Sequence, residues 1–272
     1  EKESSWFCVD DNFLGLFQRP TTDRIESDYF EQLPLATVEL DDFLIDKEKT
    51  EHLIQILAKR PVHATHVLLL GSAGTGKSSF ARALAAQLGI PAYCIVSNES
   101  NTTQKRRMAI QACVNLTNHG KGSLIVVDEA DNLLNTKLSW FERGETQDKG
   151  WLNHLLEQSG IRMIWIVNSV HGMDASVRRR FSYSLVFKKF NRLQRMRIWK
   201  SVLKANTASR AFTDSDLQDL AKQYDCNAGV IDLAVKKARE IAKPGTSRFR
   251  QAVRLSLEAY RTLELGSECF PD

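Results

Sequence analysis

Runs of apolar residues alternate with amphipathic stretches through the middle of the chain. From His66 onward the apolar runs have the length of strands, and between them apolar residues recur every three or four positions, as on one face of a helix. The pattern predicts strands at 66–71, 92–97, 123–128, 162–168 and 183–188. It predicts helices between them at 76–89, 104–118, 150–158 and 173–180. Short apolar strands joined by helices favour a parallel sheet that is covered on both faces, so the predicted fold class is α/β.

The pattern changes after Phe190, where the strand-length runs stop. Helical repeats follow near 191–204, 213–224, 227–242 and 247–264, and Pro244-Gly245 breaks the chain before the last of them. We expect this part of the chain to form an all-helical domain of about four helices.

The start of the chain has a weaker pattern. A helix is expected at 47–60, ahead of Pro61. Before it, Trp6, Phe7 and further large apolar side chains argue against a disordered tail, but prolines and acidic residues interrupt any long element. We therefore expect three parts. They are an N-terminal extension of unclear structure at 1–40, an α/β domain at 41–190 and a helical domain at 191–272.

Composition bounds these expectations without deciding the function. The length of 272 residues suggests about two domains, and 43% hydrophobic with 26% charged residues is ordinary for a globular protein. A formal net charge of +4 permits an acidic or nucleic-acid partner without arguing for one. No apolar run reaches the roughly 18–20 residues of a membrane helix, so no membrane association is expected.

The termini and cysteines point to a cytoplasmic protein. The polar start, Glu1 to Ser5, has no signal-peptide pattern, and the missing initiator Met indicates a processed chain or a piece of a longer one. The five cysteines are scattered, form no C-x-x-C pair, and have no histidine at zinc-ligand spacing. We expect reduced thiols rather than disulfides or metal ligands.

A phosphate-binding sequence follows the first predicted strand of the alternating region. Residues 71–78 read Gly-Ser-Ala-Gly-Thr-Gly-Lys-Ser, a complete G-x-x-x-x-G-K-[ST] pattern between an apolar run and an amphipathic helix. The glycines let successive N–H groups face an anion, and the helix start adds its positive end. Lys77 supplies a charge for the outer phosphates, and the Ser78 hydroxyl suits Mg²⁺. The nucleotide-binding residues expected here are Gly71, Ser72, Ala73, Gly74, Thr75, Gly76, Lys77, Ser78 and Ser79.

Polar residues end the next two central strands. Asp128-Glu129 follows an apolar run, which suits metal-assisted hydrolysis: Asp128 would hold Mg²⁺, and Glu129 would orient and polarise the attacking water. An acidic helix start is the alternative. Asn168 ends the following strand, where it would position the water or touch the γ-phosphate, although asparagine also favours turns.

Three consecutive arginines, Arg178, Arg179 and Arg180, precede Phe181 at the end of a predicted helix. They can be cations placed against the helix dipole on a solvated face. Alternatively, one of them is an arginine finger that is presented to the γ-phosphate of a neighbouring subunit. The run by itself does not decide between the two interpretations.

These features, in this order and with a helical domain behind them, resemble the AAA+ ATPases over about residues 40–265. The resemblance assigns residues 71–78 to Walker A, Asp128-Glu129 to Walker B, Asn168 to sensor 1, and Arg179-Arg180 to the arginine finger. It implies a parallel five-stranded P-loop sheet of order 5-1-4-3-2 with a C-terminal helical lid. ATP and Mg²⁺ are the implied cofactors, and a homo-oligomer, hexameric and ring-shaped when active, is the implied assembly. Leu44 and Ile45 occupy the place of adenine contacts.

The chain departs from parts of the family pattern. Asn227-Ala228-Gly229 stands where many members carry Gly-x-x-Arg; it is similar to protein-remodelling members, with Gly229 near the nucleotide, and differs from helicase loaders and clamp loaders. The segment 97–103 is polar where threading members carry an aromatic residue, so threading is in doubt. Trp140-Phe141 occupies the place of a second pore loop, although local packing is the favoured interpretation.

The resulting expectation is an ATPase that remodels an unknown protein partner as a ring. No Asn-Lys-x-Asp guanine motif follows an apolar strand, which agrees with ATP over GTP. A nucleic-acid-associated ATPase is the alternative, favoured by the net charge and by Lys105-Arg106-Arg107, although such a triplet is more often a solvated helix face. A non-hydrolysing switch or scaffold is a further class, which Glu129 and Asn168 disfavour.

Overall fold

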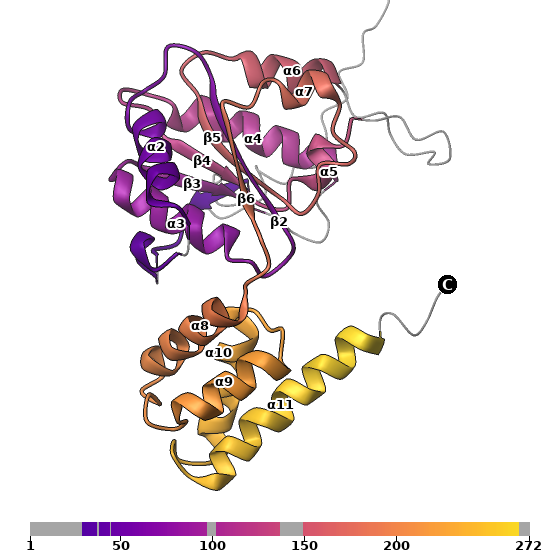
Figure 1. The fold of residues 1–272 in the computed structure, drawn as a ribbon. Coiled ribbons are helices and arrows are strands. Elements are labelled where there is room, and N and C mark those ends of the chain that lie inside the picture. The colour runs from indigo at the N-terminus through magenta and orange to yellow at the C-terminus, as the bar shows by residue number, and fades with distance from the viewer. Residues whose placement is uncertain (1–28, 37, 44, 97–101, 137–148, 267–272) are drawn as a thin grey trace, which may run out of the picture.

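The computed structural model describes residues 29–36, 38–43, 45–96, 102–136 and 149–266. These residues form a sheet with helices around it and, after residue 190, a bundle of helices (Figure 1). The strands are β1 (Phe30–Gln32), β2 (Thr65–Gly71), β3 (Ala92–Ile95), β4 (Leu124–Val127), β5 (Arg162–Val167) and β6 (Tyr183–Phe187). The helices of the sheet region are η2 (Leu40–Asp42), α2 (Lys47–Ala58), α3 (Lys77–Leu88), α4 (Thr103–Thr117), α5 (Asp131–Leu134), α6 (Lys149–Glu157) and α7 (Ala175–Arg178).

The sheet is mixed and has six strands in the order β1-β3-β4-β5-β2-β6. The strands β2 to β6 pair in parallel, but β1 is antiparallel to β3, with Phe30 opposite Ile95. The prediction of a purely parallel five-stranded sheet is therefore wrong in strand number and in one direction. The added strand is three residues long, buries only Phe30, and pairs with a strand far along the chain, so no local pattern announces it.

Helices cover both faces of the sheet (Figure 1). Successive strand side chains point to opposite faces. Thus Leu68 and Trp165 pack with residues of α4, α5, α6 and α7, whereas Leu69 and Ile166 pack with residues of α2 and α3. The near-continuous apolar character of β4 and β5, whose residues are all buried, follows from this double covering.

The helices after residue 190 are α8 (Arg192–Ala205), α9 (Asp214–Gln223), α10 (Ala228–Ile241) and α11 (Ser247–Gly266). They enclose a hydrophobic core of their own, in which Trp199, Leu220 and Phe249 are completely buried. Side-chain caps start three of these helices, including Asn227, which accepts a hydrogen bond from the Val230 N–H at 3.0 Å. None of the described helices is long and apolar enough to cross a membrane.

Candidate functional site

The glycine-rich loop links β2 to α3 and has the backbone conformation that its glycines permit. Gly74 and Gly76 have φ of 74° and 90°, in the left-handed region that side chains with a Cβ rarely adopt. Space is also restricted, because a Cβ on Gly74 would lie 2.1 Å from the Asn227 side-chain nitrogen. The loop is thus closely packed against the start of α10, in the helical part of the chain.

Lys77 is the first residue of α3 and is almost completely buried. Its ammonium group donates to the carbonyls of Gly71 and Ser72, at 2.6 and 2.9 Å, and to the Asn168 side-chain oxygen at 3.1 Å. Burial lowers the pKa of Lys77, while the negative charges of Asp128 and Asp131 oppose that shift. A cation in this position is ready to exchange carbonyl partners for phosphate oxygens.

The hydroxyl of Ser78 donates to the Asp128 carboxylate at 2.6 Å. A hydroxyl and a carboxylate are hard oxygen ligands of the kind that Mg²⁺ takes, and Mg²⁺ commonly keeps waters and phosphate oxygens as its other ligands. Across the described ranges there is no group of three or more His, Cys, Asp and Glu side chains that could hold a metal ion by itself. The pair therefore fits a Mg²⁺ ion that arrives with a nucleotide.

The turn after β4 has an uncommon backbone. Glu129 has φ of 49° although it is not a glycine, and its N–H donates to the Asp128 carboxylate at 2.9 Å. Arg106 of α4 donates to the backbone carbonyls of both Asp128 and Glu129. Because Arg106 is only 7% exposed, the interpretation of Lys105-Arg106-Arg107 as a solvated helix face is wrong for its central residue.

Asp131 is a site residue that the sequence reasoning missed. Its carboxylate accepts hydrogen bonds from the backbone N–H groups of Asn168 and Ser169, at 2.9 and 3.0 Å. This fixes the turn after β5, from which the Asn168 side chain meets Lys77. The signal in the sequence was an acidic residue at the third position after Asp128, in the first turn of the short helix α5.

The predicted chemistry converges on one pocket of about 340 Å³. Its wall includes the phosphate loop, the acidic pair, Asn168 and the start of α10; the lining site residues are Ala73, Gly74, Gly76, Lys77, Ser78, Ser79, Asp128, Glu129, Asn168 and Gly229. Arg179 and Arg180 are not among the lining residues. Arg179 is exposed, and Arg180 forms an ion pair with Glu157 at 2.6 Å.

A second pocket, of about 220 Å³, is lined by Thr75 of the phosphate loop. Ile45, one of the two expected adenine contacts, lines it together with Phe43, Phe187 and Phe190; the other, Leu44, lies outside the described residues. Phe43 and Phe187 each pack edge-on against Phe80 of α3, with ring centroids 5.3 and 5.4 Å apart.

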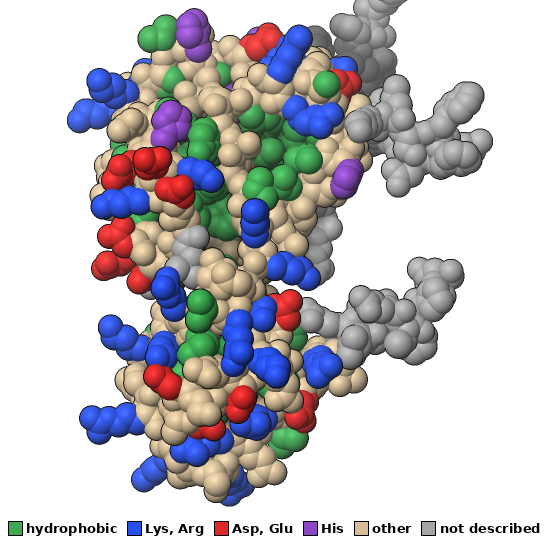
Figure 2. Space-filling view, viewed as in Figure 1, with side chains coloured by type: hydrophobic (Ala, Val, Ile, Leu, Met, Phe, Trp, Pro, Cys, Tyr) green, Lys and Arg blue, Asp and Glu red, His purple; other side chains and the backbone are tan. Residues whose placement is uncertain are grey.

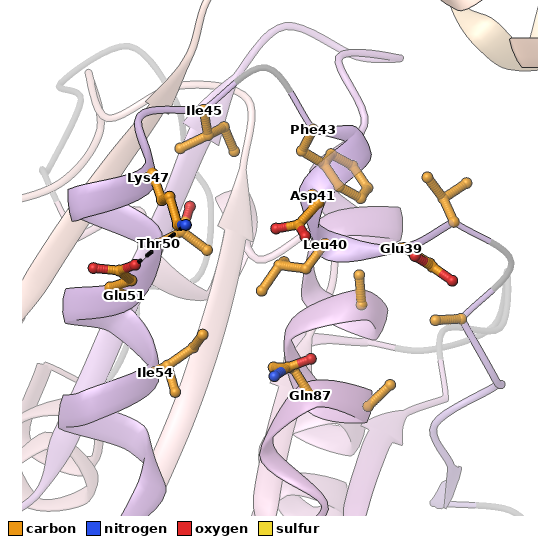
Figure 3. A pocket seen from close by; sticks show the side chains of 14 residues that line it. Glu39, Leu40, Asp41, Phe43, Ile45, Lys47, Thr50, Glu51, Ile54 and Gln87 are labelled. Atoms are coloured by element: carbon orange, nitrogen blue, oxygen red, sulfur yellow. Dashed lines mark ion pairs between the residues drawn. The ribbon is translucent and has the colours of Figure 1, made fainter.

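A wider groove of about 1040 Å³ runs between η2, α2 and α3 (Figure 3). Phe43 and Ile45 reach it as well, and Lys47 and Glu51 of α2 form an ion pair at 3.9 Å along it. No phosphate-loop residue and neither member of the acidic pair lines this groove. The groove is therefore separate from the chemistry described above.

The sheet, the loop and the polar strand ends have the arrangement expected of a P-loop nucleotide-binding domain of the α/β class. Residues 67–189 match the family described as "ATPase family associated with various cellular activities (AAA)". The match spans somewhat less than half of the chain and contains the phosphate loop, the acidic pair and Asn168.

Three curated relatives share parts of the chain. They are a replication factor C large subunit of Natronomonas pharaonis (32% identical over 117 residues), an ATP-dependent zinc metalloprotease FtsH of Synechococcus (28% over 209) and a probable spastin homologue of Brugia malayi (26% over 157). The matches cover 43%, 71% and 54% of this chain, but only 23%, 31% and 34% of the respective relatives.

Among solved structures, a chain of the E. coli MS115-1 HORMA:CdnC:Trip13 complex is similar in fold, with a TM-score of 0.60. The similarity covers 86% of this chain and 97% of that one at 15% sequence identity. At this identity the similarity concerns the fold alone.

Replacing Lys77 by alanine should abolish tight nucleotide binding, because the substitution removes the ammonium group that faces the loop carbonyls and Asn168. Titration with a fluorescent ATP analogue measures the affinity. Lys47→Ala is the matched control, since Lys47 carries the same charge on α2 outside this pocket, and it should bind as the wild type does. Unchanged affinity in Lys77→Ala would remove the basis for assigning the phosphate loop.

Proposed function

We propose that the chain binds ATP with Mg²⁺ and hydrolyses it. The observation that carries the proposal is the 2.6 Å contact between Ser78 and Asp128, in a pocket that also holds Lys77, Glu129 and Asn168. The match of residues 67–189 to the AAA family supports the same activity.

The residues of the pocket have separate roles in the proposed hydrolysis. The N–H groups of residues 71–78 and the start of α3 hold the phosphates, and Lys77 neutralises the outer ones. Ser78 and Asp128 hold Mg²⁺, which would supply charge stabilisation at the phosphoryl oxygens. Glu129 orients and polarises the attacking water, while Asn168 contacts the γ-phosphate.

The adenine base is assigned to the 220 Å³ pocket beside Thr75. Apolar and aromatic walls from Phe43, Ile45 and Phe187 suit a flat ring, and Asp46, Lys49 and Gln194 supply polar atoms at its edge. Since Thr75 lies in the phosphate loop, a single nucleotide can reach from this pocket to the phosphate site. The pocket thus supports a nucleotide with a base of purine size; the choice of ATP over GTP rests on the family.

The helical part is proposed to act as a lid, with the domain boundary near Phe190. Asn227 packs against Gly74, and the N-terminal residues of α10 line the phosphate pocket, so nucleotide state and lid position are linked.

The strand β1 pairs with β3, which assigns residues 30–32 to the α/β part. A cytoplasmic location is proposed because Cys94, Cys113 and Cys226, the cysteines in the described part of the chain, form no disulfide there.

The energy of hydrolysis is proposed to remodel a protein partner, through a homo-oligomeric ring that is hexameric when active. The FtsH and spastin relatives favour this class over others in the family, as does Asn227-Ala228-Gly229 at the lid. Glu129 and Asn168 in one pocket with the phosphate loop argue against a switch or scaffold without hydrolysis.

A nucleic-acid-associated ATPase is the second candidate. Lys and Arg side chains gather over the helical part on the face shown in Figure 2, and one relative is a replication factor C subunit. The triplet at 105–107 gives this candidate less support than its sequence suggested. Arg106 is buried beneath the acidic pair, and Arg107 lies over the Trp151 ring at 5.3 Å. Salt-sensitive binding to DNA would favour this candidate.

Glu129→Gln should separate binding from hydrolysis. The amide keeps the shape of the side chain but is a poor base, so nucleotide affinity should be retained while turnover falls by roughly 10²-fold or more. Single-turnover phosphate release and analogue titration on the same preparation measure the two quantities. If this variant hydrolyses ATP at the wild-type rate, the base lies elsewhere.

The arginine run divides into residues with different surroundings. Arg180 donates to Glu157 through two nitrogens, and Asp174 at the other end of α7 pairs with Lys149 at 2.8 Å. These ion pairs attach α7 to α6 at both ends. Within the described part of the chain, no hydrogen bond or ion pair of the exposed Arg179 side chain is found. The family resemblance assigns the finger to Arg179-Arg180, and of these two we assign it to Arg179, which is unpaired within the described residues, with an orienting part for Arg180.

If Arg179 acts on a neighbour's nucleotide, two inactive variants should restore activity when mixed. Arg179→Ala supplies an intact pocket and Lys77→Ala an intact finger, and random mixing at equal amounts places about a quarter of head-to-tail interfaces in the active pairing. ATPase activity of the mixture, compared with each variant alone, is the measurement. Arg178→Ala is the control for loss of charge from the same helix.

If Arg179 acts on the nucleotide of a neighbouring subunit, the activity of the wild-type chain should also depend on its assembly. Because a finger is worth about 10³–10⁵ in kcat in well-studied systems, specific activity should rise with protein concentration. The finger assignment would be contradicted if the mixed variants co-assemble but recover no ATPase activity, and if wild-type turnover does not depend on protein concentration. The three arginines would then be only a charged helix end.

A further inference from the structure

The helix α4 carries an arginine where its pattern calls for an apolar residue. Its buried positions are Arg106, Ala109, Ile110, Cys113 and Val114, which recur every three or four residues along one face. The last four pack in the core beneath the sheet. A buried cation within such a stripe has a large desolvation cost unless strong acceptors surround it, so its partners indicate what it does.

The partners of Arg106 are the backbone of the acidic pair. One terminal nitrogen donates to the Glu129 carbonyl at 2.8 Å and the other to the Asp128 carbonyl. The planar fork of a guanidinium spans two consecutive carbonyls, which the single ammonium of a lysine cannot do with the same geometry. Burial lowers the pKa of Arg106, and the charges of Glu129 and then Asp128 oppose that shift, so the cation also lies close to both carboxylates.

The turn that Arg106 contacts has a strained backbone conformation that its surroundings must hold in place. Glu129 has a left-handed φ of 49°, a conformation that persists in a residue other than glycine when its surroundings enforce it. The Asp128 carboxylate is fixed from two directions, by the Ser78 hydroxyl and by the Glu129 N–H. The carbonyl side of the same turn is fixed by Arg106. The Glu129 side chain itself is exposed toward the pocket that it lines.

We propose that Arg106 is a positioning residue, which holds the turn at Asp128-Glu129 so that the Glu129 carboxylate faces the water beside the γ-phosphate. The inference rests on the proposed hydrolysis, since it assigns to Arg106 the placement of the group that acts on the water. Arg106 touches neither nucleotide nor metal in this account. Its loss should therefore reduce the rate of hydrolysis and leave nucleotide binding largely intact.

The test compares Arg106→Met, Arg106→Lys and the control Lys105→Met in the full chain. Lys105 precedes Arg106 on α4, and within the described residues its side chain makes no hydrogen bond to the two carbonyls, so its replacement removes one positive charge nearby without releasing the turn. For Arg106→Met we expect kcat to fall by about 10²-fold, the size expected for a misplaced catalytic group, with affinity for an ATP analogue within about threefold of wild type. Arg106→Lys should recover part of kcat, and Lys105→Met should match the wild type.

A second comparison shows whether Arg106 acts through Glu129. In the Glu129→Gln background the Arg106→Lys substitution should lower the remaining turnover by less than about twofold, because the group that it positions is already absent. Independent losses that multiply would overturn the proposal. Wild-type kcat in Arg106→Met, or equal loss of affinity and kcat in both folded Arg106 variants, would also overturn it. If Arg106→Met does not fold, Arg106→Lys decides by the same criteria.

The outcomes also separate this inference from the proposed function. A wild-type chain that neither binds nor hydrolyses ATP contradicts the ATPase itself. A wild-type chain that does both, beside an Arg106→Lys variant of unchanged kcat, contradicts only the role of Arg106.

Discussion

The contact between Ser78 and Asp128 is the constraint on which the candidate site depends. Ser78 lies in the first turn of α3, after β2, and Asp128 follows β4; these two strands are separated in the sheet by β5. The contact therefore bridges the end of β5, where Asn168 meets Lys77. Because parallel strands end at the same edge, residues some fifty positions apart come within hydrogen-bonding distance. The proposed Mg²⁺ site and the proposed phosphate site then share one wall.

Buried cations organise this edge of the sheet. Lys77 and Arg106 are both nearly inaccessible, and backbone carbonyls accept most of their hydrogen bonds. The two differ in accessibility to a ligand. Lys77 lines the pocket, where phosphate oxygens can replace carbonyls, whereas Arg106 lies beneath the acidic pair and is not a lining residue. Lys77 is thus placed to contact a ligand, whereas Arg106 is placed to hold the turn at Asp128-Glu129 that faces the ligand.

Much of the fold could be predicted from the sequence because its signals are local. The helix expected at 76–89 is Lys77–Leu88, and the strand expected at 162–168 is Arg162–Val167. The glycines, Lys77 and Ser78 could be named as candidates because a phosphate loop needs these residue types at fixed spacing. Where the ligand-facing chemistry is encoded in a short segment, the pattern and the geometry agree on which residues come together.

What could not be predicted depends on partners far along the chain. The strand β1 exists through pairing with β3, and Arg106 is recognised as buried only when the turn at Asp128-Glu129 packs over it. Arg180 illustrates the same limit, since Glu157, its ion-pair partner, comes from a different helix. Asp131 acts on the turn after β5 through two backbone N–H groups that lie 37 and 38 positions further along the chain.

The most direct test of the account is phosphate release from ATP by the wild-type chain, measured with Mg²⁺, with excess EDTA, and after Mg²⁺ is restored. The account predicts turnover with Mg²⁺, none in EDTA, and full recovery on restoration, because Ser78 and Asp128 are proposed to hold a metal that arrives with the nucleotide. No release under any condition, or the same release in EDTA, would contradict the claim that this edge of the sheet is a metal-dependent ATP-hydrolysing site.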